Sequence, residues 1–375
     1  MKKIAILMMY LGTGGIEKQT ISMANMLADD YDIEIISLYN FKYVSFDIDP
    51  RIKVRYLMNT GSNRKEFKNA LKNKDIKNVL KEGFKSLYVL SVKDLKMINY
   101  IKHSDADILF STRIEYAKMI SKYNIKHIPS ITQEHNYIDT PEYEKQVQES
   151  MYGIDTLVVM SKVASDTYKK WLKGTNVKVV TIPNMLNEIP IESSNMKNNT
   201  LIAAGRLVPV KNFMELIDVF KIVHDKDKTI TLTIVGDGEE RNKLQEHVNE
   251  LKLYNNVNFT GMLAPDDVKK AMLYSDLYVM TSLRECFPMV LLEANSLGVP
   301  AISYDVKTGP VAIIKDSKTG YLIDNHNKEE MASKILNYMH NQSIKNMMSI
   351  NAKEESRKYI PTKIKPLWIK ILGKD

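Results

Sequence analysis

The sequence of 375 residues contains one cysteine and no long apolar run. Because Cys286 has no second cysteine to pair with, a scaffold of internal disulfides is excluded and a reducing compartment is favoured. No stretch approaches the roughly 18 apolar residues of a membrane-spanning helix. Low-complexity tracts and internal repeats are also missing. A hydrophobic content of 44% and a charged content of 26% are those of an ordinary soluble globular protein and argue against disorder.

The length predicts two domains, or three, at roughly 150 residues per domain. Short apolar segments alternate with longer helical ones, such as 17–28 and 116–122, and this alternation is typical of a parallel sheet with helices on both faces. The predicted strands of the first sheet are 4–9, 33–38, 54–56, 107–110, 127–132 and 156–160. After a polar, aperiodic linker at 187–200, the second sheet has predicted strands at 201–204, 231–235, 257–260, 277–280, 299–303 and 320–323. We therefore expect an α/β fold of two Rossmann-like domains that face each other across a cleft.

The N-terminus imitates a short signal peptide, because Lys2 and Lys3 precede an apolar run. No small-residue cleavage site follows, so the pattern favours a buried first strand that leads into the turn Gly12-Thr13-Gly14-Gly15. The third glycine of a dinucleotide fingerprint would fall on Glu17, and no Walker lysine follows. Two alternatives remain for this turn. Its backbone N–H groups and helix N-terminus can approach a phosphate or sugar, or its glycines serve a tight turn with positive φ.

Positive charge is concentrated in the segment from Arg64 to Lys102. The whole chain carries +8, and this segment holds eleven basic residues against Glu66, Asp75, Glu82 and Asp94. Apolar residues recur between the charges at helical spacing, which predicts one or two basic amphipathic helices. Such helices lie on anionic membranes or hold acidic ligands. The alternative is a solvated helix whose apolar stripe packs on its own domain. Nucleic acid is not an expected partner, because no known nucleic-acid module is visible.

Two pairs of charged residues follow predicted strands of the second domain. Arg206 and Lys211 come after strand 201–204, where two cations suit a diphosphate. Glu285 lies in the loop after strand 277–280, and Glu293 lies in the helix that begins near Pro288. Carboxylates at that position accept hydrogen bonds from sugar hydroxyls, and the free N–H groups of the helix start suit a phosphate. Taken singly, each pair is also compatible with ordinary surface charge.

In this order, the motifs resemble the family 4 retaining glycosyltransferases, which have the GT-B fold. The segment Glu285-Cys286-Phe287-Pro288-Met289-Val290-Leu291-Leu292-Glu293 matches the E-x7-E motif of that family. The other matching motifs are Gly205-Arg206-Leu207 with Lys211, the turn Gly236-Asp237-Gly238, Ser161, Ile182-Pro183-Asn184, Gly14-Gly15 with Glu17, and Trp368 in a terminal helix. The resemblance covers the whole chain and is more specific in the second half.

The resemblance implies a transferase of the EC 2.4 type that moves a hexosyl group from a nucleotide-diphosphate sugar, with UDP the expected nucleotide, to a glycan acceptor. The product is expected to be a surface polysaccharide or glycoconjugate. The positive charge of the segment from Arg64 to Lys102, in the acceptor-side domain, predicts an acceptor linked to polyprenyl diphosphate. An enzyme of this kind is expected in the cytoplasm, peripheral on the inner membrane face, where the segment from Arg64 to Lys102 would meet anionic lipid. No metal or other cofactor is expected. The residues do not identify the base, the sugar, the linkage or the acceptor.

The resemblance also implies roles for individual residues. Arg206 and Lys211 would neutralise the diphosphate, Glu293 would bind the ribose, and Glu285 would contact the donor sugar. His135 would hydrogen-bond the sugar and stabilise an oxocarbenium-like charge during front-face attack. The remaining donor contacts would come from Gly14 and Gly15, from Gly236, from Gly261, Met262 and Leu263 around the base, and from the backbone of Phe287, Pro288, Met289 and Val290.

Four positions depart from the family pattern: Asn212, Met185 and Cys286 stand where glycine is usual, and Ala312 where glutamate is common. Because of these departures, the donor preference of the family is harder to assign to this chain. Two D-x-D sequences, at 47–49 and 105–107, are not expected to bind a metal.

The expected domains are 1–190 on the acceptor side, 191–355 for the nucleotide sugar, and a terminal helix in 356–375 that crosses back to the first domain. The alternatives are a nucleotide-sugar epimerase or phosphorylase of the same two-domain shape, and a sugar-binding protein without catalysis.

Overall fold

The computed structural model describes residues 1–12, 14–40, 46–59 and 64–373, and the chain forms two compact units. The first unit comprises Met1–Met160, Ser165–Ile182 and Lys365–Asp375, and the second comprises Ser161–Ala164 and Pro183–Ile364. The division after Ile182 comes earlier than residue 190. The polar segment 187–200 is irregular up to Asn199, as expected of a linker, but it belongs to the second unit.

The first unit is built on a seven-stranded parallel sheet in the order β3-β2-β1-β4-β5-β6-β7. Its strands are β1 (Lys3–Met8), β2 (Asp32–Tyr39), β3 (Lys53–Met58), β4 (Ile108–Ser111), β5 (Ser130–Gln133), β6 (Thr156–Val159) and β7 (Lys178–Thr181). Its helices are α1 (Gly15–Leu27), α2 (Arg64–Lys72), α3 (Ile76–His103), α4 (Ile114–Tyr123), α5 (Pro141–Met151), α6 (Lys162–Trp171, which starts in the second unit) and the end of α14 (Pro361–Leu372). Strand β4 is buried along its whole length, as expected of a strand covered on both faces.

The second unit repeats this design with a six-stranded parallel sheet in the order β10-β9-β8-β11-β12-β13. Its strands are β8 (Thr200–Ala204), β9 (Thr231–Val235), β10 (Val257–Gly261), β11 (Leu277–Met280), β12 (Ala301–Tyr304) and β13 (Gly320–Ile323). Its helices are α7 (Phe213–Lys226), α8 (Arg241–Glu250), α9 (Pro265–Leu273), α10 (Met289–Ser296), α11 (Gly309–Ile313), α12 (Lys328–Met339) and α13 (Gln342–Ser356), with short 3-10 turns η1 (Pro209–Lys211) and η2 (Arg357–Tyr359). The predicted α/β class is confirmed.

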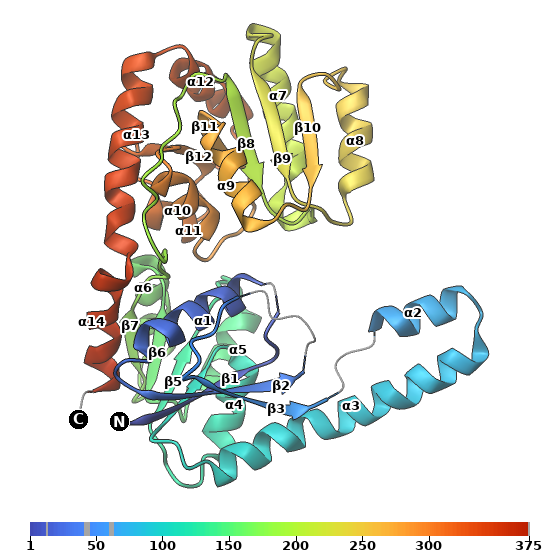
Figure 1. Cartoon of the computed structure of the whole chain (residues 1–375), viewed down its shortest axis with the longest axis vertical. Helices are drawn as coiled ribbons and strands as arrows, with labels where there is room; N and C mark the ends of the chain where they lie inside the picture. The colour runs from blue at the N-terminus through green and yellow to red at the C-terminus, as the bar shows by residue number, and fades with distance from the viewer. Residues whose placement is uncertain (13, 41–45, 60–63, 374–375) are drawn as a thin grey trace. The chain divides into compact units, whose positions relative to one another are not determined.

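The end of helix α14 belongs to the first unit and lies close to the N-terminus of the chain (Figure 1). The indole of Trp368 is 2% exposed and its ring centre lies 5.6 Å from that of Phe110 in β4. The Lys365 ammonium lies 2.7 Å from the Asp30 carboxylate, and Lys2 donates to the carbonyl of Gly373. Trp368 thus completes the core on one face of the first sheet. Among the described residues, no helix has the length and apolar character needed to cross a membrane.

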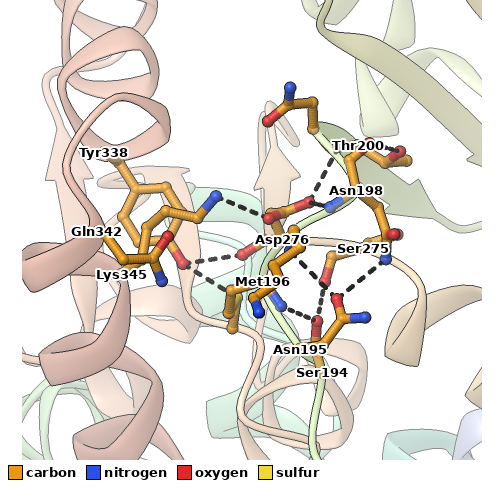
Figure 2. Close-up of polar contacts among 12 residues, drawn as sticks. Ser194, Asn195, Met196, Asn198, Thr200, Ser275, Asp276, Tyr338, Gln342 and Lys345 are labelled. Carbon is orange, nitrogen blue, oxygen red and sulfur yellow. Dashed lines mark hydrogen bonds and ion pairs between the residues drawn. The ribbon is translucent and has the colours of Figure 1, made fainter.

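A buried ion pair ties together the amino ends of the second sheet (Figure 2). The Lys345 ammonium of α13 lies 2.8 Å from the Asp276 carboxylate, and the two side chains are 4% and 0% exposed. The other oxygen of Asp276 accepts from the backbone N–H groups of Asn198 and Thr200, at 3.1 Å each. Tyr338 of α12 donates to the Asp276 carbonyl at 2.9 Å. Through its carboxylate and its backbone carbonyl, Asp276 therefore joins the end of the linker segment, β8, β11 and two helices.

Replacing Lys345 by alanine should destabilise the second unit strongly. The variant leaves the Asp276 carboxylate buried without its cation, and removing one partner of such a pair costs about 3–5 kcal/mol. Urea unfolding monitored by circular dichroism measures the loss. Lys243→Ala, which removes an exposed lysine of α8, is the matched control and should change the free energy of unfolding by less than about 0.5 kcal/mol. Equal stabilities of the two variants would contradict this role of the pair.

Candidate active site

The strand order of the second sheet reverses between β8 and β11, and ligands of such sheets bind outside the carboxyl ends of the strands at that point. Three of the predicted site residues follow these two strands. Arg206 and Lys211 come after β8, and Glu285 comes after β11. Arg206 is exposed, whereas Lys211 and Glu285 are mostly buried, with side chains 23% and 11% exposed. The structure thus gathers one set of predicted residues at the edge where a ligand binds.

An ion pair joins two of these residues across the switch point. The Lys211 ammonium lies 2.5 Å from Oε1 of Glu285. Two hydrogen bonds hold the loop of Lys211 against the loop after β11: Leu283 donates its N–H to the Val210 carbonyl, and the Thr281 hydroxyl donates to the Asn212 carbonyl, both at 2.9 Å. The cation and the carboxylate are therefore placed by backbone hydrogen bonds between the two loops, and their charges compensate each other.

Asn212 and Cys286, two of the departures from the family pattern, fit the local backbone. Asn212 has φ of +53°, in the left-handed region that asparagine tolerates better than most residues with a side chain. Its side chain amide also donates to the Glu215 carboxylate at 2.5 Å. Cys286 is not among the residues with positive φ, so its Cβ causes no backbone strain. The loops therefore keep their shape without glycine at these positions.

The turn at Gly236 supports the Arg206 loop by close packing. Gly236 has φ of +132°, and a Cβ there would lie 1.9 Å from the carbonyl oxygen of Gly205. At Gly238 a Cβ would lie 2.3 Å from the carbonyl oxygen of Leu207, whose N–H donates to the Asp237 carbonyl at 3.0 Å. The GDG sequence is therefore explained by contact between two backbone turns. A donor contact of Gly236 remains a prediction.

The loop after β11 is supported by the segment before α11. The Thr308 hydroxyl donates to the Glu285 carbonyl at 2.6 Å, and a Cβ at Gly309 would lie 2.7 Å from Cβ of Glu285. Phe287 is 7% exposed, and its ring centre lies 5.9 Å from that of Tyr359. Thr308 and Gly309 were missed by the sequence reasoning, although a Thr-Gly-Pro sequence at a helix start is a visible signal.

Helix α10 begins at the carboxyl edge with Pro288 as its N-cap residue. Met289 and Val290 are its first residues, and backbone N–H groups of a first turn have no partner within the helix. Glu293 lies one turn further along, partly buried. The buried phenol of Tyr278 bonds to both backbone groups of Ala204, and its pKa is raised by burial and by the charges of Glu285 and Glu293. Both predicted carboxylates therefore lie near one tyrosine under the switch point.

The predicted base-binding residues lie at the carboxyl end of β10, two strands away from β8. Gly261 has φ of +75°, and its carbonyl accepts from the Gly236 N–H at 2.9 Å. Met262 is 74% exposed, and Leu263 is half-buried. An exposed methionine at this edge offers an apolar surface to a planar ring, so the placement agrees with the predicted role without testing it.

In the first unit, the glycine turn follows β1, next to the reversal of strand order between β1 and β4. Thr13 lies outside the described residues. Neither Gly14 nor Gly15 has positive φ, so the left-handed turn considered from the sequence is not the reason for these glycines. A Cβ at Gly14 would lie 2.1 Å from Oε2 of Glu17, whereas a Cβ at Gly15 would meet nothing within 4 Å. A Cβ at Gly14 would therefore displace only the end of a flexible side chain, and the surface over Gly15 is open.

His135 lies in a loop that is anchored on both sides of it. The Glu134 N–H donates to the Val158 carbonyl at 3.0 Å, and the Tyr168 hydroxyl donates to the Asn136 carbonyl at 3.0 Å. The ring of Tyr137 stacks on Trp171, with centres 6.3 Å apart. Nε2 of His135 is shielded from solvent and has no hydrogen-bond partner among the described residues. An imidazole nitrogen held in this way is prepared to accept or donate one bond to a ligand.

Glu134 is a buried carboxyl that the sequence reasoning missed. It is 2% exposed, and its Oε1 accepts from the Asn136 N–H at 2.7 Å. Burial raises the pKa of Glu134 to about 7. Burial, with the nearby Arg113 guanidinium, lowers the pKa of His135 to about 4. His135 is thus neutral near pH 7, and the Glu134 carboxyl keeps its proton up to about that pH. Only knowledge of the burial separates Glu134 from the many exposed glutamates of the chain.

The two D-x-D sequences take part in ion pairs with basic side chains. Asp49 pairs with Arg51 at 2.7 Å, and Asp105 pairs with Lys3 at 2.6 Å. Within the part of the chain that the structure describes, no three histidine, cysteine, aspartate or glutamate side chains gather as metal ligands would.

Sequence comparison relates the second unit to a known family. Residues 185–355 match the family described as "Glycosyl transferases group 1". An uncharacterized glycosyltransferase of Haemophilus influenzae is 28% identical and covers 99% of this chain and 100% of its own. An N-acetyl-D-galactosaminyltransferase of Campylobacter jejuni is named for an undecaprenol-linked substrate. It is 25% identical, and the match covers 100% of this chain and 99% of that protein. An exopolysaccharide phosphotransferase of Streptomyces coelicolor is 26% identical over 95% of this chain, which spans 39% of that longer protein.

Solved structures match over the full length of the chain. TarM of Staphylococcus aureus, crystallised with UDP among its ligands, has a TM-score of 0.79 at 18% identity over 100% of both chains. HepE of Anabaena in complex with UDP-glucose has a TM-score of 0.74 at 19% identity over 99% of both chains. At such identities the likeness establishes the fold.

The fold is therefore GT-B, with two Rossmann-like halves, as the sequence predicted. The family match over the second unit and the glycosyltransferases among the relatives support a glycosyltransferase of the EC 2.4 type.

The opposite pKa shifts of Glu134 and His135 predict a hidden pH dependence of stability. Neutral Glu134 stabilises the folded state at low pH, and this contribution, up to about 3 kcal/mol, is lost as the pH rises from 4.5 through 7. The His135 contribution is present above pH 6.5 and is lost as the pH falls towards 4. The two trends overlap and oppose each other in the wild type.

Single variants should separate these trends in urea unfolding between pH 4 and 8. We expect Glu134→Gln to lose stability on acidification below pH 6.5 and His135→Gln to lose stability as the pH rises towards 7. Identical pH profiles for the two variants would refute the assignment.

Proposed function

We propose that the chain is a retaining glycosyltransferase that moves a sugar from a UDP-linked donor to a glycan acceptor. The observation that carries the proposal is the Lys211–Glu285 pair with Arg206 at the β8/β11 switch point, beside the open start of α10. Two cations and a helix N-terminus suit a diphosphate, and carboxylates suit sugar and ribose hydroxyls. The UDP named for TarM and the UDP-glucose named for HepE support the choice of nucleotide.

In the proposed reaction, the bond between the anomeric carbon and the diphosphate oxygen breaks, and the acceptor oxygen bonds to that carbon on the same face. The acceptor proton passes to a phosphate oxygen of the departing UDP. Arg206, Lys211 and the N–H groups of Met289 and Val290 stabilise the negative charge that develops on the diphosphate. Glu285 binds the donor sugar and Glu293 the ribose. His135 donates to or accepts from the sugar, and its neutral form near pH 7 avoids charge repulsion with an oxocarbenium-like centre.

The remaining donor contacts are proposed at the positions named from the sequence: Gly14 and Gly15 at the phosphates, Gly236 at the donor, Gly261, Met262 and Leu263 at the base, and the backbone of Phe287 and Pro288 beside Met289 and Val290. No metal ion is assigned a part in the reaction. The cations of the chain carry the charge compensation instead.

We further propose that the acceptor is carried on polyprenyl diphosphate and that the enzyme works at the cytoplasmic face of the membrane. The undecaprenol-linked substrate named for the Campylobacter jejuni relative supports the lipid carrier. The basic segment from Arg64 to Lys102 supports contact with an anionic surface. The phosphotransferase named for the Streptomyces coelicolor relative is the competing activity, and it would leave a phosphate in the product, whereas the proposed reaction leaves none.

Donor binding should raise the thermal stability of the protein. In a thermal-shift screen without metal, against UDP, GDP, ADP and their sugar conjugates, we expect UDP to stabilise the wild type by about 2.7 kcal/mol at 100 times its Kd. Arg206→Ala should abolish the shift, and Arg357→Ala, which removes a partly exposed arginine of η2, should keep it. If none of these nucleotides produces a thermal shift, even after Mg²⁺ is added, the result would favour the sugar-binding alternative. Binding without transfer to any acceptor would favour the epimerase.

Gly15→Ala should separate catalysis from folding. Since a Cβ there meets nothing in the fold, we expect an unfolding temperature equal to or slightly above that of the wild type, because alanine favours a helix by up to about 1 kcal/mol. If the donor phosphates approach this turn, kcat/KM for the donor should fall at least about tenfold, a loss of roughly 1.4 kcal/mol. Gly83→Ala in α3 is the matched control. Wild-type activity of Gly15→Ala would remove the turn from the donor site.

A further inference from the structure

Helices α2 and α3 form a hairpin that extends beyond the sheet of the first unit (Figure 1). The last part of α3 packs into the unit. Met97 and Ile101 are fully buried, and the Tyr100 hydroxyl donates to the Glu34 carboxylate at 3.3 Å. The first part of α3 packs against α2. Phe67 of α2 lies beside Gly83 of α3, and a Cβ added at Gly83 would be 3.6 Å from the phenyl ring. Among the described residues, the hairpin is thus anchored in the unit through the last part of α3.

The projecting part of α3 carries large apolar side chains that the described part of the unit leaves exposed. They are exposed by between 53% and 75%. These residues, called the α3 stripe below, are Ile76, Leu80, Phe84, Leu87, Tyr88, Leu90 and Leu95. Intervals of four, four and three residues from Ile76 to Leu87 place most of them along one side of the helix. The sequence left open whether this stripe packs on its own domain. In the structure, the α3 stripe is exposed, whereas Val89 and Met97 of the same helix are buried.

Positive charge surrounds the α3 stripe. Lys77 and Lys81 are exposed, and Lys85 is half-buried. The segment that forms the hairpin carries eleven basic residues against four acidic ones. A second copy of the chain docked stripe to stripe would bring these like charges together, which is unfavourable. An anionic bilayer offers the complement to both features, because its headgroups attract the lysines and its acyl region takes up the apolar side chains.

We propose that the α2–α3 hairpin is a membrane-docking arm whose α3 stripe enters the interface of an anionic bilayer. The inference deepens the membrane association proposed above, since it names the contact surface and adds shallow insertion to charge attraction. It does not depend on the transfer chemistry. Attraction by charge alone would disappear at high salt, whereas insertion of the stripe keeps part of the binding.

Vesicle sedimentation of the full chain tests the arm. The vesicles are phosphatidylcholine alone or mixed with phosphatidylglycerol, at low and high salt. We expect the wild type to bind the mixed vesicles at least about tenfold more tightly than the neutral ones. Phe84→Ser with Leu87→Ser should lose at least about tenfold in binding at both salt concentrations. Lys77→Gln with Lys81→Gln and Lys85→Gln should lose mainly the preference for anionic lipid.

Tyr254→Ser with Ile350→Ser, which removes two exposed apolar side chains of the second unit, is the matched control and should bind like the wild type. The UDP-induced thermal shift should be the same in every variant. If UDP does not shift the unfolding temperature of the wild type, the result would therefore count against the proposed function and not against the membrane-docking arm.

Three results would overturn the proposal: no binding of the wild type to mixed vesicles, equal binding of the stripe variant and the wild type, or self-association in sedimentation velocity that the stripe variant loses. The last would assign the stripe to a second copy of the chain.

Discussion

Parallel pairing of the strands is the constraint on which the rest of this structure depends. Because every strand pairing in both sheets is parallel, each strand is followed by a crossover, and all the loops after strands collect at one edge of each sheet. At the two points where the strand order reverses, adjacent crossovers leave in opposite directions and the loops part. The Arg206 loop, the Glu285 loop, the Gly15 turn and the His135 loop all lie at such edges. The chemistry proposed for the chain is a consequence of this geometry.

Two lysine–carboxylate pairs at opposite edges of the second sheet show how the same chemistry serves different ends. The Lys345–Asp276 pair at the amino edge is fully buried and has backbone N–H groups on the second carboxylate oxygen, so it is a permanent part of the fold. The Lys211–Glu285 pair at the carboxyl edge keeps partial exposure on both partners. A ligand can therefore exchange with one partner at modest cost. In our account, the diphosphate pairs with Lys211, and the donor sugar binds Glu285.

The sequence predicted the fold well where apolar runs are long and buried. Both sheets, all of their strands except β7, and the glycine turn came from this pattern. Strand β7, Lys178–Thr181, was missed because it is a short edge strand whose residues are half-exposed or exposed, and it lacks the continuous apolar run of the central strands. The basic hairpin was visible as an amphipathic segment, but whether its stripe was covered depended on tertiary packing. Glu134 was invisible for the same reason, since a glutamate next to a histidine carries no signal of burial.

Isothermal titration calorimetry of UDP on Lys211→Gln and Glu285→Gln tests the central claim most directly. If the diphosphate replaces Glu285 as the partner of Lys211, Lys211→Gln should weaken UDP binding at least about tenfold, or roughly 1.4 kcal/mol. Glu285→Gln should bind UDP as tightly as the wild type or more tightly, because no ion pair has to be broken, and yet should lose transfer. Equal loss of affinity in both variants, or no loss in Lys211→Gln, would contradict the account.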